Sequence, residues 1–308
     1  LRLVAADARR FVRTAREPYD LIVSDNFHPA RSGSGSLYTV EHFAAVQQRL
    51  APGGLFCQWL PLHQLDLDTL RSIVRAFLAV YPEGRAMLAT NSLDTPVLGL
   101  LARRGGGGFD AARLRARLAS PAMLRSPADF GIEDEFALLG SFIAGPRSLA
   151  RFAGTAPLNT DDHPVVAYRA PRVTYAPDSL PRDRLLALLR ELEISPEELL
   201  ATPPDAALAS RLAAYGRARE RFLEVGRHVQ PSADVQRMLA QVGEPLLEVL
   251  RLSPDFRPAY DPLLRMAAAL ARDDVAAARR LLRQLQAAQP ARREAGQLLR
   301  ELPGAGLP

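Results

Sequence analysis

One short segment of the chain combines residue types that could carry out proton transfer. An apolar run over residues 21–23 stops at Asp25, and His28 follows three positions later. The run has the length of a buried strand, so Asp25 is expected at its carboxyl end, where open α/β sheets bind ligands. A carboxylate there can take a proton from a nucleophile and hold the nucleophile in line. The structural alternative is that Asp25 caps the following turn, as aspartate before loop residues often does.

A second segment holds residue types that are common in metal sites. Residues 159–164 read Asn-Thr-Asp-Asp-His-Pro. Two aspartates and a histidine this close together cannot readily all face one ion on a strand or a helix, although a loop could bend them together. A turn stabilised by its own side chains and ended by proline is favoured, so we expect no metal site in this chain.

The pattern around these segments predicts alternating strands and helices. Helices are expected to begin at Asp7, to run from an N-cap at Thr39 to Leu50, and to begin at Asp66 or Asp68. Strands are expected over residues 1–5 and 21–24, from the turn at 52–54 through Trp59, and over 85–90 and 96–101, the last two as an antiparallel hairpin. This alternation indicates a mainly parallel α/β sheet with an antiparallel edge.

The rest of the chain is predicted to be mostly helical. The glycine run 105–108 indicates a flexible linker, and a helical extension follows that ends in a short strand over 165–168. From residue 180 the pattern is purely helical, with a helical hairpin that opens at Pro254. Another helix is expected at Pro290, 36 positions later, and this spacing resembles the period of about 34 residues in tetratricopeptide repeats.

Composition excludes several classes of protein. The chain has 308 residues, 48% hydrophobic and 24% charged, which is typical of globular proteins. Its net charge is +5, but the basic residues are all arginine and are scattered among acids, so nucleic-acid binding is not expected. The lone Cys57 lies in an apolar run and is predicted to be a buried, inert thiol. No apolar run approaches the roughly 20 residues of a membrane helix.

The order of these parts resembles the spermidine synthase (polyamine aminopropyltransferase) family, in particular a bacterial branch in which this domain follows a membrane-embedded half. The resemblance implies a partial Rossmann-like sheet of the S-adenosylmethionine-dependent transferases, followed by a tetratricopeptide-like helical region. The expected domains are residues 1–104 for the sheet, 105–179 for the linker and extension, and 180–308 for the helical region. Because the likeness begins in the middle of the fold, we expect a C-terminal fragment that is inactive alone.

The resemblance also implies roles for individual residues. Asp25 matches the family's catalytic aspartate, and Asp7 with Ala8 matches a pair that contacts the adenine of the co-substrate. Tyr38 lies where the family's loop closes over its substrates, and Gln58 matches a glutamine at the end of the next strand, so the resemblance implies that both bind substrate. The alternatives are that Tyr38 only packs and that Gln58 only satisfies a sheet edge. The implied co-substrate is decarboxylated S-adenosylmethionine, or S-adenosylmethionine itself, and the implied acceptor is a small amine.

His28 departs from the family pattern, which has a second aspartate that helps to hold the polyamine cation. A neutral imidazole offers a dication no formal charge, and a protonated imidazole would repel it. His28 could act as an alternative base in catalysis, or it could simply bind a loop carbonyl. This departure puts ordinary putrescine chemistry in doubt.

Three functions therefore remain open. The first is aminopropyl transfer to a polyamine acceptor, and the second is methyl transfer by an S-adenosylmethionine-dependent methyltransferase. The third is a non-catalytic scaffold that binds a protein partner through its helical tail. The resemblance places this segment in the cytoplasm, with the parent protein anchored in the inner membrane by a segment ahead of residue 1.

Overall fold

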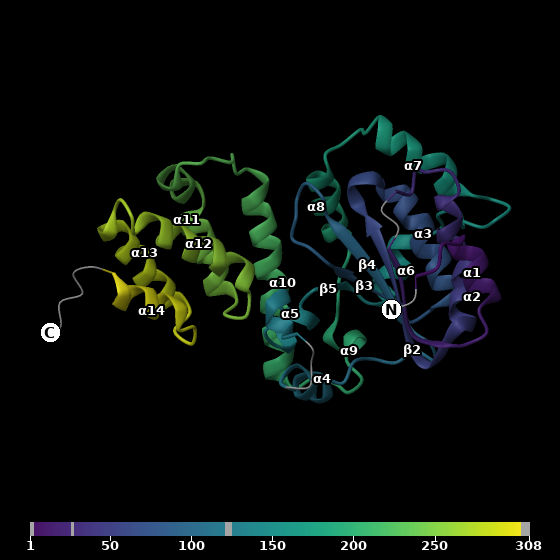
Figure 1. Ribbon diagram of the computed structural model, residues 1–308, viewed down its shortest axis with the longest axis horizontal. Helices are drawn as coiled ribbons and strands as arrows, with labels where there is room; N and C mark the ends of the chain where they lie inside the picture. The colour runs from purple at the N-terminus through teal and green to yellow at the C-terminus, as the bar shows by residue number, and fades with distance from the viewer. Residues whose placement is uncertain (1–2, 26–27, 121–124, 303–308) are drawn as a thin grey trace. The chain divides into compact units, whose positions relative to one another are not determined.

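A computed structural model describes residues 3–25, 28–120 and 125–302. Contacts divide the chain into two units, each made of two separate stretches (Figure 1). The first unit comprises Leu1–Leu114 and Ser141–Pro204, and the second comprises Arg115–Gly140 and Asp205–Pro308. The sequence pattern predicts domain boundaries after residues 104 and 179 instead. These positions differ from the bounds of the units because sequence patterns do not show that the chain leaves the first unit and later returns to it.

The first unit is built on a five-stranded mixed sheet. Its strands are β1 (Tyr19–Asp25), β2 (Leu50–Pro61), β3 (Arg85–Leu88), β4 (Val97–Arg103) and β5 (Phe142–Ala144), in the order β1-β2-β4-β3-β5. The α/β class and the β3–β4 hairpin are confirmed. Parallel pairing is limited, among the described strands, to β1 with β2, and the other neighbours are antiparallel. The prediction of a mainly parallel sheet is therefore wrong. The chain passes from β1 to its neighbour β2 through the helix α2, which is the kind of connection that a parallel pair needs.

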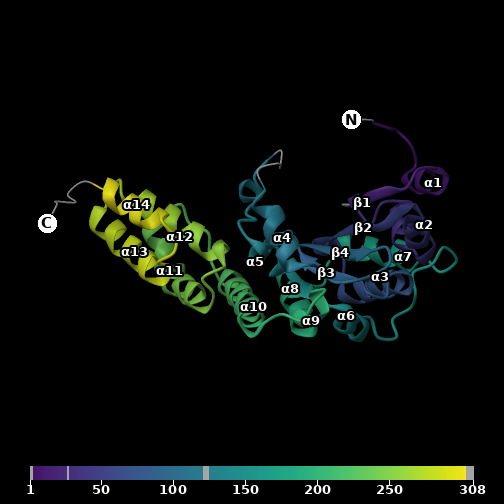
Figure 2. The same cartoon turned by 90° about the horizontal axis from the view of Figure 1, so that it is seen from below.

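The two faces of the sheet differ in how they are covered. Ile22 is paired with Phe56, and the Phe56 side chain is fully buried in an aromatic cluster with Phe43 and Phe77. Helices α3, α6 and α7 lie along this side of the sheet in Figure 2. Side chains alternate between faces along a strand, so Leu21 and Val23 point the other way, and they are 57% and 50% exposed. One face of β1 is therefore apolar and open.

Three helices of the first unit begin where side-chain caps predict. The Asp7 carboxylate caps α1 (Ala8–Thr14), Thr39 caps α2 (Val40–Arg49), and Asp66 caps α3 (Leu67–Val80). Each cap accepts a hydrogen bond from a main-chain N–H three residues later. The other elements of this unit are the 3-10 helices η1 (Ser34–Tyr38) and η2 (Leu62–Gln64) and the helices α6 (Pro146–Ala153), α7 (Val165–Tyr175), α8 (Pro181–Glu191) and α9 (Pro196–Leu199).

Two predicted strands are wrong. Residues 3–5 lie in no strand, whereas Leu1 and Arg2 lie outside the described residues. A strand needs a hydrogen-bonded neighbour, and in the described part of the sheet β1 pairs with β2 alone. Residues 165–168 begin the helix α7 instead of forming a strand. The side chain of Asn159 explains this second difference, because its Oδ1 accepts the N–H of Val166 at 3.1 Å and so satisfies the first turn of the helix.

The glycine run after β4 is held in place by the strand beside it. Gly105, Gly106 and Gly107 have positive φ angles, which suit glycine. The N–H of Gly107 donates to Glu83 Oε2 at 2.6 Å, and its carbonyl accepts from the Arg85 guanidinium at 3.1 Å. The expected linker is thus a turn bonded within the first unit.

The second unit is an array of helices, as predicted. It contains η3 (Pro127–Phe130), α5 (Glu135–Leu139), α10 (Ala206–Arg227), α11 (Val235–Leu252), α12 (Arg257–Leu270), α13 (Val275–Ala288) and α14 (Glu294–Glu301), while α4 (Ala111–Leu118) crosses the boundary. The α12–α13 hairpin is confirmed, with Asp274 capping α13. The helix expected at Pro290 begins at Glu294, and the tetratricopeptide likeness stays a prediction. No described helix is both long enough and apolar enough to cross a bilayer.

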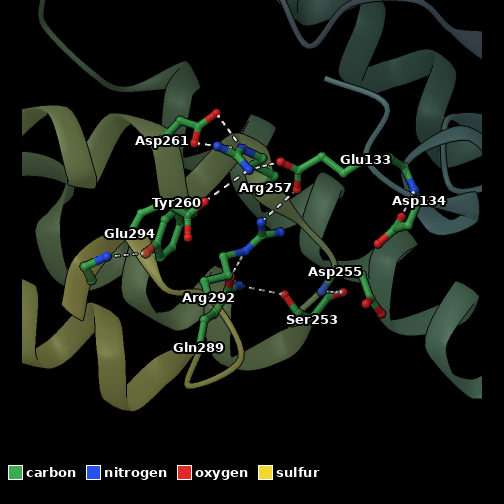
Figure 3. A network of polar contacts seen from close by, with 12 residues as sticks. Glu133, Asp134, Ser253, Asp255, Arg257, Tyr260, Asp261, Gln289, Arg292 and Glu294 are labelled. Atoms are coloured by element: carbon green, nitrogen blue, oxygen red, sulfur yellow. Dashed lines mark hydrogen bonds and ion pairs between the residues drawn. The ribbon is translucent and has the colours of Figure 1, made fainter. Parts of the chain in front are cut away.

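Charged side chains tie the segment before α5 to the C-terminal helices of this unit (Figure 3). Glu133 accepts hydrogen bonds from Arg257 and, at 2.8 Å, from Arg292. Arg257 also pairs with Asp261 on its own helix at 3.0 Å. The hydroxyl of Tyr260 accepts the N–H of Ala295 at 3.2 Å. These contacts join Glu133 to helices that lie more than 120 residues later in the sequence, beside an apolar core that includes Phe256, Leu263 and Leu281.

Candidate functional site

The carboxyl ends of β1 and β2 meet at one edge of the sheet. The two strands are parallel, and Asp25 is paired with Trp59 at this edge. Asp25 is exposed, and among the described residues its carboxylate has no hydrogen bond or ion pair. Burial, and then the negative charge of Asp25, raise the pKa of the Cys57 thiol to about 12. The predicted position of Asp25 at the end of β1 is confirmed, and its negative charge affects the ionisation of the buried Cys57.

A groove runs along the open face of β1 toward Asp25. It has a volume of about 710 Å³, within the range of small-molecule sites. One wall is β1 and the other is α1 with the residues before it, and the lining is Val4, Ala6, Ala8, Phe11, Val12, Glu17, Tyr19, Leu21, Ile22 and Val23. Val23 and Asp25 share one face of the strand and are two residues, or roughly 7 Å, apart. The carboxylate therefore lies beyond the end of an apolar groove.

The two residues predicted to contact adenine lie at the start of α1. Ala8 lines the groove. The Oδ1 atom of Asp7 accepts the N–H of Arg10 at 2.7 Å as the helix cap, and the side chain is exposed. A carboxylate has two oxygens, so the cap leaves the second one able to accept another hydrogen bond. Their predicted contact with adenine stays a prediction.

The two residues predicted to bind substrate are both buried. Tyr38 is fully buried at the end of η1, away from solvent. Gln58 is fully buried as well, and its Nε2 donates to the carbonyl of Trp59 at 3.0 Å and to that of Ser24 at 3.4 Å. Gln58 is paired with Ser24, so it points to the covered face of the sheet while Asp25 points to the open one. The structure therefore does not bring Tyr38 or Gln58 to the groove.

Two residues that the sequence prediction missed lie beside His28. The amide nitrogen of Gln64 contacts Nδ1 of His28 at 3.4 Å and Nε2 of His63 at 3.0 Å. Both new residues belong to η2, directly after β2, so they follow a strand end as Asp25 does. A place directly after a strand end is a sequence signal from which His63 and Gln64 could have been predicted. These contacts link His28 to η2.

The surroundings of His63 favour its neutral form. Burial, then the positive charge of Arg184, then His28, lower the pKa of His63 below its ordinary value. The guanidinium of Arg184 is buried and donates to the carbonyls of Leu62 at 3.2 Å and His63 at 3.0 Å. Arg184 thus holds the backbone of η2 in place, and its positive charge lies next to the main-chain carbonyls of Leu62 and His63.

The segment 159–164 forms a structural turn, as predicted. Thr160 Oγ1 accepts the N–H of His163 at 3.0 Å. Asp161 accepts from Thr39 Oγ1 at 3.0 Å and pairs with Arg9 of α1. Burial opposes the ionised form of Asp161, but the hydrogen bonds from Arg9 and Thr39 outweigh it and lower the pKa of this carboxyl. Across the described residues, no group of three His, Cys, Asp or Glu side chains could hold a metal ion.

Comparison with known proteins gives few matches. No family model matches the chain, and no curated protein matches it. One similar solved structure is the crystal structure of a probable spermidine synthase from Corynebacterium glutamicum, which is 20% identical with a TM-score of 0.36. The match covers 51% of this chain and 53% of the other, so this chain spans about half the length of that protein.

Proposed function

We propose that the edge formed by the carboxyl ends of β1 and β2 transfers an aminopropyl group from decarboxylated S-adenosylmethionine to an amine, with Asp25 as the base. The observation that carries the proposal is the position of Asp25. Its carboxylate is exposed, has no partner among the described residues, and follows an apolar groove on the same face of β1. A free carboxylate at such a place can hold an amine and take its proton.

The reaction needs few groups from the protein. The amine nitrogen attacks the methylene carbon next to the sulfonium, a carbon–nitrogen bond forms, and the carbon–sulfur bond breaks with its electron pair left on sulfur. The sulfonium thereby becomes a neutral thioether, and the nitrogen loses a proton to Asp25. Free amines have a pKa of about 10, so at neutral pH a base is needed to supply the neutral nucleophile.

The groove suits the co-substrate in its chemistry. Apart from Glu17 its lining consists of apolar residues and Tyr19. Such walls fit an adenine ring and a thioether, and a groove that ends beside a carboxylate would bring the sulfonium carbon close to the amine. Under this proposal Asp7 and Ala8, at the start of α1, contact the adenine.

The test compares two aspartates of the same strand. The protein encoded by the complete open reading frame is incubated with decarboxylated S-adenosylmethionine and a panel of amines, and product masses are read. We expect an aminopropyl adduct, and we expect Asp25→Asn to lower its rate by about 100-fold or more, the usual contribution of a general base. The matched control is Asp20→Asn, an exposed carboxylate near the other end of the same strand.

The same assay separates the rival function. With S-adenosylmethionine as the donor, a methyl adduct would favour a methyltransferase. An Asp25→Asn variant as active as the wild type would remove Asp25 from its proposed role. Absence of both adducts would contradict transfer chemistry and favour the non-catalytic alternative.

A further inference from the structure

The side chain of Gln64 contacts two histidine rings. These contacts bear on which nitrogen of each ring carries the proton. Gln64 is 8% exposed, so its amide has little freedom to turn toward water. One amide nitrogen contacts both Nδ1 of His28 and Nε2 of His63. An NH₂ group has two hydrogens and no acceptor capacity, so in this orientation of the amide each ring nitrogen that it contacts is an acceptor.

The opposite orientation of the amide leaves more groups unsatisfied. In the observed orientation, Oε1 of Gln64 and Nδ1 of His63 are buried without partners among the described residues. If the amide were turned over, both of its N–H groups would take the buried place of Oε1, and Nδ1 of His63 would still lack a partner. Amide orientation is decided by such counting, and each unsatisfied buried donor is costly. The count of unsatisfied groups therefore favours the orientation in which the NH₂ group of Gln64 faces the two histidines.

This arrangement makes the free side of His28 a hydrogen-bond donor. Neutral imidazole carries one proton, and Nδ1 accepts from Gln64, so the proton is on Nε2. His28 is exposed, so this N–H is open to a ligand. No carboxylate within the described part of the chain pairs with His28, and the charge of Arg184 lies behind η2. This end of the site therefore presents a hydrogen-bond donor, the Nε2–H of His28.

We propose that the amine substrate carries a hydrogen-bond acceptor at its far end, best a carboxylate, and that His28 Nε2–H binds it. The inference rests on the proposed function and narrows its substrate class. Asp25 binds the amino end of the substrate, which is cationic before deprotonation. His28 binds the other end, which accepts a hydrogen bond and is best an anion. A diamine satisfies Asp25 but brings a second cation to a donor, whereas an amino acid satisfies both ends.

One measurement tests the tautomer without any substrate. In protein labelled with ¹⁵N at histidine, long-range ¹H–¹⁵N spectra at pH 7.5 distinguish protonated from unprotonated ring nitrogens. The chain has five histidines, and the His28 signals are those that vanish in the His28→Asp variant. We expect the proton on Nε2 and an unprotonated Nδ1. A proton on Nδ1 would overturn the inference.

A second measurement tests the substrate class with three amines of equal length. Binding of 4-aminobutanoate, 4-amino-1-butanol and 1,4-diaminobutane is followed by calorimetry. We expect 4-aminobutanoate to bind about tenfold more tightly than the diamine, with the alcohol between them. His28→Asp should reverse the order, and the matched control His163→Asp, at an exposed histidine in the 159–164 turn, should keep it. A wild-type preference for the diamine would overturn this inference alone, and no binding of any of the three would overturn the proposed function too.

Discussion

The environment of Cys57 decides the reactivity of the thiol. The residue is 7% exposed, and burial together with the charge of Asp25 raises its pKa to about 12. The thiolate is the reactive form of cysteine, so almost none is present at pH 8. We expect the folded protein not to react with an aromatic disulfide reagent at pH 8, and the denatured protein to react fully, as read from the absorbance of the released thiolate. Rapid labelling of the folded protein would show that the interior beside Asp25 is open.

His42 should make the first unit sensitive to mild acid. Burial, then the charges of Arg9 and Arg13, lower its pKa to about 4, from an ordinary 6.5. Below pH 6.5 the unfolded state therefore binds a proton that the folded state rejects. The contribution to stability is complete above pH 6.5 and is lost as the pH falls toward 4. At pH 5 the loss amounts to about 2 kcal/mol.

The His42→Leu variant tests this dependence, because leucine has a similar size and does not titrate. Free energies of unfolding are measured in urea at pH 7 and pH 5. The wild type should lose about 2 kcal/mol more than the variant over this interval. Asp161, whose pKa is lowered, acts only in more acidic solution and does not interfere. Equal losses in both proteins would contradict a buried neutral His42.

At the scale of elements, Asn159 joins two helices that are distant in sequence. Its side chain is fully buried, donates to the carbonyl of Gly35 at 3.3 Å and accepts the N–H of Val166 at the start of α7. Its main-chain carbonyl accepts the N–H of Val40 at the start of α2 at 3.0 Å. One residue thus satisfies the first turns of two helices, whose N–H groups otherwise lack partners.

We expect Asn159→Ala to lower the free energy of unfolding by about 1–3 kcal/mol, because it leaves a buried N–H and a buried carbonyl without partners. The matched variant Asn159→Asp keeps the acceptor for Val166 and loses the donor to Gly35. Urea unfolding followed by circular dichroism measures both. If alanine proved neutral, the bonds of Asn159 would not be what anchors α7.

Elements with local signals were predictable from the sequence, and those that depend on distant partners were not. Asp7, Thr39 and Asp66 mark helix starts within one turn, and the apolar run before Asp25 marks β1. The sequence of α7 predicts a strand because the side chain that satisfies its first turn, Asn159, lies six residues before Val165 in an irregular turn. At the site, the end of β1 identified Asp25, but the contacts of Gln64 with two histidines exist only in three dimensions.

At the scale of the whole molecule, each unit needs two separate stretches of chain. Residues 115–140 belong to the second unit, whose other part begins only at residue 205. Within this unit the Arg211 guanidinium lies 3.7 Å from the centre of the Phe136 ring, and Arg219 donates to the carbonyl of Gly140 at 2.5 Å. The stretch 115–140 therefore depends on α10, and completing the second unit requires synthesis well beyond residue 140.

A chain that ends at Pro204 should keep the first unit and lose the order of residues 115–120 and 125–140. The truncation removes α10, so Phe136 loses its cation–π contact and Glu133 loses both arginine partners. Limited digestion with trypsin followed by mass spectrometry should show early cleavage after Arg115 and Arg117 in the truncated chain and slow cleavage in the full chain. Cleavage after Arg75 in α3 serves as the internal control, since its helix packs within the first unit, and it should be slow in both chains. Equally slow cleavage after Arg115 and Arg117 in the two chains would mean that this part of the second unit is ordered without the helices that follow.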